Sequence, residues 1–249
     1  MGITTEPKTD ILCEAPKSEN QSKEESDKLC FSENVCMSCV GIIDIVNSTK
    51  ITAQMSRNQM RRFYSHFLNW ATAIVTAYGG LVVKNMGDSL LFHFPVPEDQ
   101  LDKRSIRDCL NCSIALSKLQ PNICSKFRAE SLPDLNYRIS VDFGEVSFAT
   151  SADAPNPDIF SITVNICSKI NSFAAPNMVV IGGDMYEVSK DLSGYSFQET
   201  SRTVSVSNRS YPVYTVTESK SGFRVLQFIR NRASPANSQL PKLRGVNEA

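Results

Sequence analysis

The chain has 249 residues with 26 acidic and 26 basic side chains, so its formal net charge is zero. This balance argues against a nucleic-acid coat protein or a membrane-surface protein that works through bulk charge, and no nucleic-acid partner is expected. The composition, 41% hydrophobic and 21% charged, is that of an ordinary globular protein. No stretch approaches the roughly 20 apolar residues of a membrane span, and the N-terminus lacks a signal-peptide pattern. We therefore expect a soluble, cytoplasmic protein without a membrane span.

Charge is distributed unevenly along the chain. Residues 1–34 carry eight acids against four bases and show almost no periodic hydrophobicity, which predicts a disordered acidic tail. Residues 220–249 carry six bases against one acid, so residues 218–249 are expected to form a basic, mostly flexible tail. The folded domain is then expected to span residues 35–217.

A buried strand and an amphipathic helix are the first elements predicted within this domain. Residues 40–46 form an apolar run interrupted by Asp44, which indicates a buried strand with a carboxylate near its end. Ser56 is a favourable N-cap residue, and apolar side chains recur after it every three or four positions. The pattern ends at Gly79 and Gly80, which predicts the C-terminus of the helix.

A β-hairpin is predicted next, from two apolar runs over residues 81–86 and 89–94 that flank Gly87 and Asp88. The remaining predicted elements are a helix over 101–119, a strand over 137–143, a helix over 163–174, a strand over 178–181 and a strand pair within 203–216.

The predicted order β, α, β, β, α, β indicates an α+β fold with a ferredoxin-like core and additional C-terminal strands. In this topology the first strand lies beside the hairpin, so the carboxylates of Asp44 and Asp88 can converge. Hard divalent cations prefer oxygen ligands, and two carboxylates together with substrate phosphates suit a two-metal phosphoryl-transfer site. A single aspartate is otherwise a turn or cap residue, but an unpaired carboxylate in an apolar run is costly to bury.

Two CxxC pairs allow an alternative metal site. Cys36 and Cys39, together with Cys109 and Cys112, would supply four thiolates to zinc if the fold joined them. Cys39 lies in an apolar strand and the second pair lies on a predicted helix. These positions favour the simpler interpretation, in which the cysteines are small core residues.

Four segments, taken together and in order, resemble the catalytic domain of class III nucleotidyl cyclases. They are residues 41–49 (GIIDIVNST), 83–88 (VKNMGD), 143–146 (FGEV) and 157–169 (PDIFSITVNICSK). The resemblance covers residues 35–217. It implies that two such domains pair head to tail, with each active site shared across the interface, so that one chain forms a homodimer with two complete sites.

The resemblance also implies the metal and phosphate ligands. Asp44, Asp88 and the backbone carbonyl of Ile45 would bind two Mg²⁺ or Mn²⁺ ions per site. The turn that follows would offer backbone N–H groups to the triphosphate, as loops that open a helix do. The residues of this turn are Val46, Asn47, Ser48 and Thr49.

Lys84 and Asp158 resemble the pair with which the partner subunit of such cyclases reads adenine, and Asn165 the residue that orients the ribose. The implied function is that of an adenylate cyclase, a lyase that converts ATP to 3′,5′-cyclic AMP and pyrophosphate. A guanine-reading site would carry the reversed polarity. Lys169 takes the position at which an arginine usually stabilises the reacting phosphorus.

The sequence departs from the family pattern in several places. Lysine at position 169 lacks the planar donor fork of arginine, and Asn47 replaces a glycine in the phosphate turn. The further phosphate-binding lysine of the family is replaced by Val206, for which the nearby Arg209 is a candidate substitute. These departures leave a catalytically weak or silent nucleotide-binding or dimerisation module as the alternative. The sequence also leaves open an unknown regulatory partner. A third alternative is an unrelated ferredoxin-like interaction protein.

Overall fold

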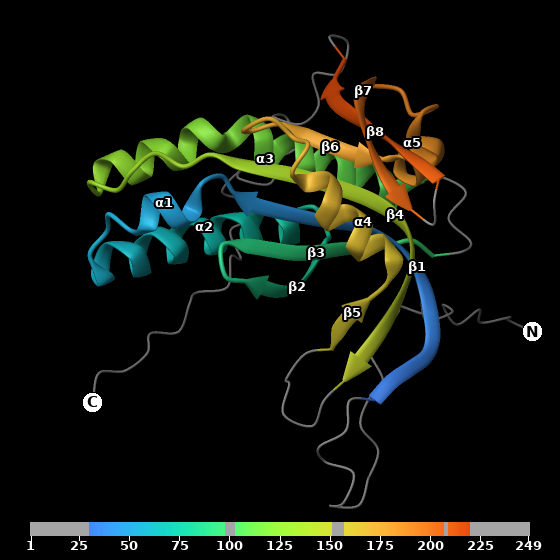
Figure 1. Cartoon of the computed structure of the whole chain (residues 1–249), viewed down its shortest axis with the longest axis horizontal. Coiled ribbons are helices and arrows are strands. Elements are labelled where there is room, and N and C mark those ends of the chain that lie inside the picture. The colour runs from blue at the N-terminus through green and yellow to red at the C-terminus, as the bar shows by residue number, and fades with distance from the viewer. Residues whose placement is uncertain (1–29, 98–102, 151–156, 207–208, 220–249) are drawn as a thin grey trace, which may run out of the picture.

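Figure 1 shows the computed structural model of the chain, which describes residues 30–97, 103–150, 157–206 and 209–219. Most of the two predicted tails, residues 1–29 and 220–249, therefore lies outside the described residues. The elements in chain order are β1 (Cys30–Ile45), α1 (Ser48–Thr52), α2 (Arg57–Ala77), β2 (Leu81–Met86), β3 (Ser89–Pro95), α3 (Arg104–Ala129), β4 (Tyr137–Thr150), β5 (Asp158–Phe160), α4 (Ile162–Asn171), β6 (Val179–Gly182), α5 (Gly183–Ser189), β7 (Tyr195–Val206) and β8 (Arg209–Glu218).

The strands form one sheet in the order β2-β3-β1-β4-β6-β8-β7, with β5 paired to β4 off this path. Strands β2, β3, β1 and β4, connected through α2 and α3, make up the predicted ferredoxin-like βαββαβ core. Strands β6, β8 and β7 extend the sheet beyond β4, as the prediction of additional C-terminal strands requires. The α+β fold class is confirmed.

Helices cover the two faces of the sheet unequally. Helices α2 and α3 pack on one face, where Phe63, Phe67 and Phe127 are fully buried in the largest apolar cluster. Helix α4 lies across the other face (Figure 1), where its Cys167 packs with Val40 of β1 in a second cluster. Successive residues of a strand point to opposite faces, so the odd-numbered apolar positions of β1 face α2 and α3 and the even-numbered positions face α4.

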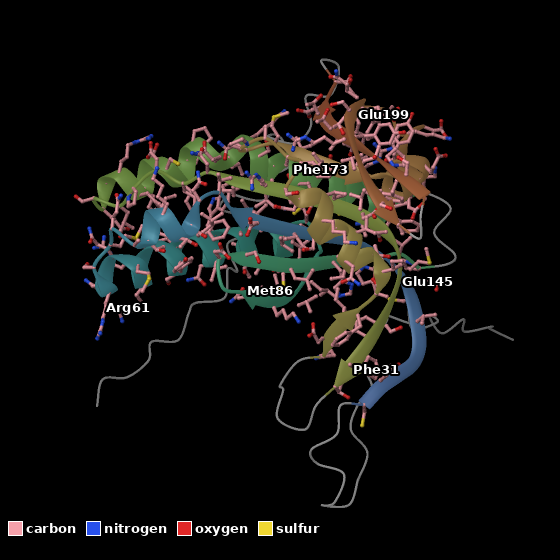
Figure 2. The ribbon with its side chains drawn as sticks, viewed as in Figure 1. Phe31, Arg61, Met86, Glu145, Phe173 and Glu199 are labelled. Carbon is pink, nitrogen blue, oxygen red and sulfur yellow. The ribbon has the colours of Figure 1, made fainter. Side chains whose placement is uncertain are left out.

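Strands β1 and β4 are both longer than predicted. They pair with each other from Cys30 opposite Thr150 to Ile45 opposite Tyr137, and their far ends project with β5 beyond the rest of the sheet (Figure 1). Figure 2 shows Phe31 on this projection, where its ring lies 5.3 Å from that of Phe160. Cross-strand pairing extends these strands into residues whose own sequence pattern was too weak to predict a strand.

Helix α3 also extends further than predicted, through Pro121 to Ala129 instead of ending at residue 119. Proline normally ends a helix because it lacks an N–H and clashes with the preceding turn. Here the residues after it are apolar at helical spacing, and Ile123 and Phe127 are buried in the core. Their burial offsets the cost of the proline.

The local signals at α2 and the hairpin are confirmed. Ser56 caps α2, since its hydroxyl accepts from the backbone N–H of Gln59 and the Gln59 side chain accepts from the Ser56 N–H. Gly87, in the turn between β2 and β3, has a φ of 71°, a conformation that glycine adopts without strain. None of the helices in the described segments combines the length and apolar character that a membrane crossing requires.

Candidate active site

Asp44 and Asp88 lie together where β1 ends beside the β2–β3 turn. Asp44 pairs with Ser89 in the β1–β3 register, and the backbone N–H of Ile45 donates to the carbonyl of Asp88 at 3.2 Å. Burial, followed by the nearby Asp88 carboxylate, raises the pKa of Asp44 to about 6. Two carboxylates that lie close together in a partly buried place repel each other, and a bound cation relieves this repulsion.

Arg138 is a residue of this site that sequence reasoning missed. It lies directly opposite Asp44 in the β1–β4 pairing, and its charge partly offsets the rise in the pKa of Asp44. Its buried Nε has no hydrogen-bond partner within the part of the chain that the structure describes. The signal was present in the alternation of polar and apolar residues along β4, where Arg138, Ser140 and Asp142 share one face.

The turn between β1 and α1 brings the hydroxyl of Ser48 into hydrogen-bonding contact with Asp88. Asn47 adopts a left-handed conformation with φ 57°, which asparagine tolerates better than most residues. Ser48, the first residue of α1, is only 8% exposed, and its Oγ donates to Oδ2 of Asp88. Thr49 is exposed. The first backbone N–H groups of α1 have no acceptor within the helix, because no preceding turn supplies carbonyl groups to them.

The donor set suits hard divalent cations. Carboxylate and carbonyl oxygens are the ligands that Mg²⁺ and Mn²⁺ prefer, and the carboxylates of Asp44 and Asp88 together with the strand-end carbonyl of Ile45 are of this kind. Within the described residues no three His, Cys, Asp or Glu side chains gather as a metal site. The chain therefore offers a partial shell, which fits cations that take further oxygens from substrate phosphates and water.

Lys84 and Asp158 meet although 74 residues separate them. Lys84 of β2 donates from Nζ to Oδ2 of Asp158 in β5. Their side chains are 43% and 28% exposed, so the pair is open to solvent. The structure thus brings together the two residues expected to read the base.

Asn165 and Lys169 lie one helical turn apart on the outer, exposed side of α4, whereas Ile166 and Ile170 face the sheet. Both side chains are thus available to a ligand or to a second subunit. Lys169 also lies in the last turn of α4, where a positive charge is favourable beside the helix C-terminus. That position gives Lys169 a structural role independent of catalysis.

The proposed substitute for the missing phosphate lysine remains untested. Arg209 begins β8 and pairs with Val206 of β7, but its side chain lies outside the described part of the chain. Arg202 of β7 instead stacks over the ring of Phe173, with its Cζ 5.6 Å from the ring centroid. Phe173 lies just after the C-terminus of α4 (Figure 2). Arg202 is therefore positioned past the last turn of α4, which carries Lys169.

The two CxxC pairs do not form one zinc site. Cys39, Cys109 and Cys112 are fully buried in the cluster beneath α2 and α3. Cys36 packs against the cluster on the opposite side of the sheet. The alternation of side chains along β1 separates the thiols, and the core interpretation of the buried cysteines holds.

With this geometry in place, the comparisons with known proteins identify the family. The family described as "Adenylate and Guanylate cyclase catalytic domain" matches residues 32–217. The chain belongs to this class III cyclase family. The cyclase domain has the same fold as the adenylyl cyclase CyaB from P. aeruginosa, with a TM-score of 0.68 at 20% identity over 76% of this chain and 97% of that structure. A guanylyl cyclase, Cya2, superimposes with a TM-score of 0.66 at 17% identity, over 77% of this chain and 96% of that one.

Curated relatives of this cyclase domain differ in the nucleotide they are named for. A cytidylate cyclase of Escherichia coli is 23% identical over 58% of this chain and 33% of its own length. An adenylate cyclase of Streptomyces coelicolor is 26% identical over 57% of this chain and 31% of its own length. The chain thus spans about a third of the curated relatives it matches.

Proposed function

We propose that the cyclase domain is an adenylate cyclase that converts ATP to 3′,5′-cyclic AMP and pyrophosphate at a homodimer interface, with two Mg²⁺ or Mn²⁺ ions per site. The observation that carries the proposal is the convergence of Asp44 and Asp88 at the strand end, beside a turn that opens α1. Lys84 and Asp158 form a second polar centre suited to a base. The folded domain, expected over residues 35–217, extends slightly further, because β1 begins at Cys30 and β8 ends at Glu218. The charged tails are proposed to lie on either side of these strands.

The reaction needs one bond to form and one to break. The ribose 3′-oxygen bonds to the α-phosphorus, the bond from that phosphorus to the pyrophosphate oxygen breaks, and the hydroxyl proton passes to solvent. Bound divalent cations supply acidification of the hydroxyl and neutralisation of phosphate charge. Asp44, Asp88 and the Ile45 carbonyl would hold them.

Residues of the partner subunit complete the proposed site. Asn165 orients the ribose. The positive charge of Lys169 stabilises the negative charge that develops on the phosphate oxygens during the reaction. In the subunit that carries Asp44, the turn residues Asn47, Ser48 and Thr49 contact the triphosphate, with Arg209 as a further candidate contact. The backbone N–H of Val46 already donates to the carbonyl of Asn136 at 2.8 Å, so Val46 would act only through the position of the turn.

The Lys84–Asp158 pair supports selection of the base by its hydrogen-bonding edge. An ammonium donates to a ring nitrogen, and a carboxylate accepts from an exocyclic amine, which is the pattern that adenine presents. Guanine carries a carbonyl oxygen where adenine carries the amine, and its adjacent ring nitrogen bears a hydrogen. A guanine in the same position would therefore face the carboxylate with an acceptor and the ammonium with a donor. Once a bound nucleotide buries Lys84 and Asp158, each group left without its partner costs about 1–3 kcal/mol.

CTP is a second candidate substrate for the same reason. Cytosine carries an exocyclic amine beside a ring-nitrogen acceptor, so its edge has the same polarity as that of adenine. Two of the curated relatives are cytidylate cyclases. The polarity of Lys84 and Asp158 therefore argues against GTP and UTP, whereas discrimination between ATP and CTP depends on the size of the base.

A catalytically weak or silent cyclase-like module is the alternative to an active cyclase. It is favoured by lysine in place of arginine at position 169 and by Val206 in place of a phosphate-binding lysine. Under this alternative the domain binds nucleotide or dimerises without turnover.

Purified protein incubated with Mn²⁺ and ATP, CTP, GTP or UTP tests these alternatives directly. We expect cyclic AMP and pyrophosphate from ATP, with an Asp44→Ala variant as the inactive control. Cyclic CMP as the main product would transfer the function to the second candidate, and preference for GTP would contradict the roles of Lys84 and Asp158. Folded protein that yields no cyclic product above the control, with any of the four nucleotides, would favour the silent module.

A mixing experiment tests the shared interface. Asp44→Ala removes a metal ligand and Asn165→Ala removes the ribose contact, so each homodimer should be inactive. A hybrid dimer keeps one complete site, and we expect the mixture to regain activity. Absence of recovery after subunit exchange has been verified, for instance by energy transfer between labelled chains, would place all the residues of a site in one subunit.

A further inference from the structure

The side chain of Ser48 makes a contact that its proposed role in the phosphate turn does not use. In that role only the backbone of the turn is needed. The structure instead buries Ser48, 8% exposed, and directs its hydroxyl to Oδ2 of Asp88. The two residues lie 40 positions apart in the sequence. The contact thus joins the turn after β1 to the hairpin turn between β2 and β3.

Asp88 is held at two points as a result. Its backbone carbonyl accepts from the N–H of Ile45 at 3.2 Å, and its carboxylate accepts from Ser48. The backbone contact holds the β2–β3 turn against β1. The contact with Ser48 favours one rotamer of the Asp88 side chain. Because the Ser48 hydroxyl occupies one lone pair of Oδ2, Oδ1 and the second lone pair of Oδ2 are left for another partner.

We propose that Ser48 is a positioning residue that orients the Asp88 carboxylate for divalent cation binding. This inference rests on the proposed metal role of Asp44 and Asp88. Partners that orient a ligating carboxylate usually contribute strongly to metal affinity, and their removal typically weakens binding by about 10- to 100-fold. A hydroxyl on Asp88 also reduces the repulsion between its carboxylate and that of Asp44, whose pKa Asp88 raises.

Mn²⁺ binding, followed by the loss of the free-ion electron paramagnetic resonance signal, tests the role of Ser48 without turnover. The titration uses the full chain and Mn²⁺ alone. We expect Ser48→Ala to weaken binding by about 10- to 100-fold, whereas Ser48→Thr, which keeps the hydroxyl, should stay close to the wild type. Ser48→Cys keeps the volume but donates poorly, so it should behave like Ser48→Ala even if the alanine variant folds badly.

Matched controls separate this inference from the proposed function. Ser65→Ala removes an exposed serine hydroxyl from α2 and should leave Mn²⁺ affinity unchanged, whereas Asp88→Ala should abolish binding. If Asp88→Ala loses Mn²⁺ and folded Ser48→Ala or Ser48→Cys binds it as the wild type does, Ser48 only closes the turn and the inference is overturned. If the wild type itself binds no Mn²⁺ and the Asp88→Ala variant keeps its cyclase activity, the metal site fails and the role of Ser48 fails with it.

Discussion

Asp44 and Asp142 are two carboxylates on the α4 side of the same sheet, but their surroundings differ. Asp142 of β4 is completely buried. Its carboxylate accepts hydrogen bonds from the backbone N–H of Phe143 and from the hydroxyl of Tyr211, each at 2.9 Å. Asp44 instead lies beside another carboxylate, Asp88, with one arginine opposite it. The chain satisfies one carboxylate with its own donors and places the other against a like charge.

The hydrogen bonds of Asp142 join three elements. The Tyr211 hydroxyl of β8 donates to Asp142 and accepts from the N–H of Asp184 in α5 at 2.8 Å. A Cβ at Gly182 would lie 2.4 Å from Oδ1 of Asp142, so glycine is needed there for the carboxylate to pack. Burial raises the pKa of Asp142 to about 7, although these hydrogen bonds oppose the rise. We infer that Asp142 serves the structure and that Asp44 and Asp88 serve a ligand.

Asp88→Ala should give the largest effect, because it removes a proposed metal ligand. We expect cyclase activity to fall by at least about a hundredfold, since cation contributions to such transition states amount to several kcal/mol. Unfolding in urea should change little by comparison. Asp191→Ala, which removes an exposed carboxylate, serves as the control, and comparable activity in the two variants would contradict the role of Asp88.

Asp142→Ala should show the opposite pattern, with lost stability and retained activity in the molecules that fold. Its removal leaves the Tyr211 hydroxyl and backbone N–H groups without their buried acceptor, which costs about 3 kcal/mol. That corresponds to a decrease of roughly 6–12 °C in Tm for a domain of this size. Calorimetry at pH 6 measures the decrease in Tm. The Tyr211→Phe variant should show a smaller decrease than Asp142→Ala. If stability is unchanged while activity is lost, Asp142 belongs to the reaction and the comparison fails.

Asp44→Asn should stabilise the metal-free protein at pH 8. The folded-state pKa of about 6 lies above the ordinary value of 3.8, so the native state binds more protons than the unfolded state between these values, and stability falls as the pH rises through them. After a reduction for solvent screening, the ionised Asp44 costs about 1 kcal/mol at pH 8, or roughly 2–4 °C in Tm. Thermal unfolding in EDTA should show this gain at pH 8 and none at pH 4. A loss of stability at pH 8 would contradict the unfavourable charge pair.

Arg138→Gln should give the smallest effect. Removal of this charge raises the pKa of Asp44 further, so the acidic limb of the activity profile at low Mn²⁺ should move up by about one pH unit from a midpoint near 6. Arg61→Gln, at the exposed start of α2 (Figure 2), is the matched control. An unchanged limb in Arg138→Gln would show that Asp44 does not control metal binding in this range.

Local periodicity and short-range turn chemistry were sufficient to predict several parts of this protein from its sequence. The cap at Ser56, the end of α2 at Ala77 just before Gly79 and the hairpin at Gly87 follow from a few adjacent residues. Their order then fixed the ferredoxin-like core. That topology was enough to predict the convergence of Asp44 and Asp88, because it places the first strand beside the hairpin.

Contacts between side chains that are distant in the sequence follow from the three-dimensional fold and were not predictable from local pattern. The lengths of β1 and β4 depend on each other through pairing along the projection, and α3 continues past Pro121 because the core beyond it is apolar. The contact between Ser48 and Asp88 and that between Tyr211 and Asp142 span 40 and 69 residues. Such contacts depend on strand order, register and rotamer, which the local sequence pattern does not encode.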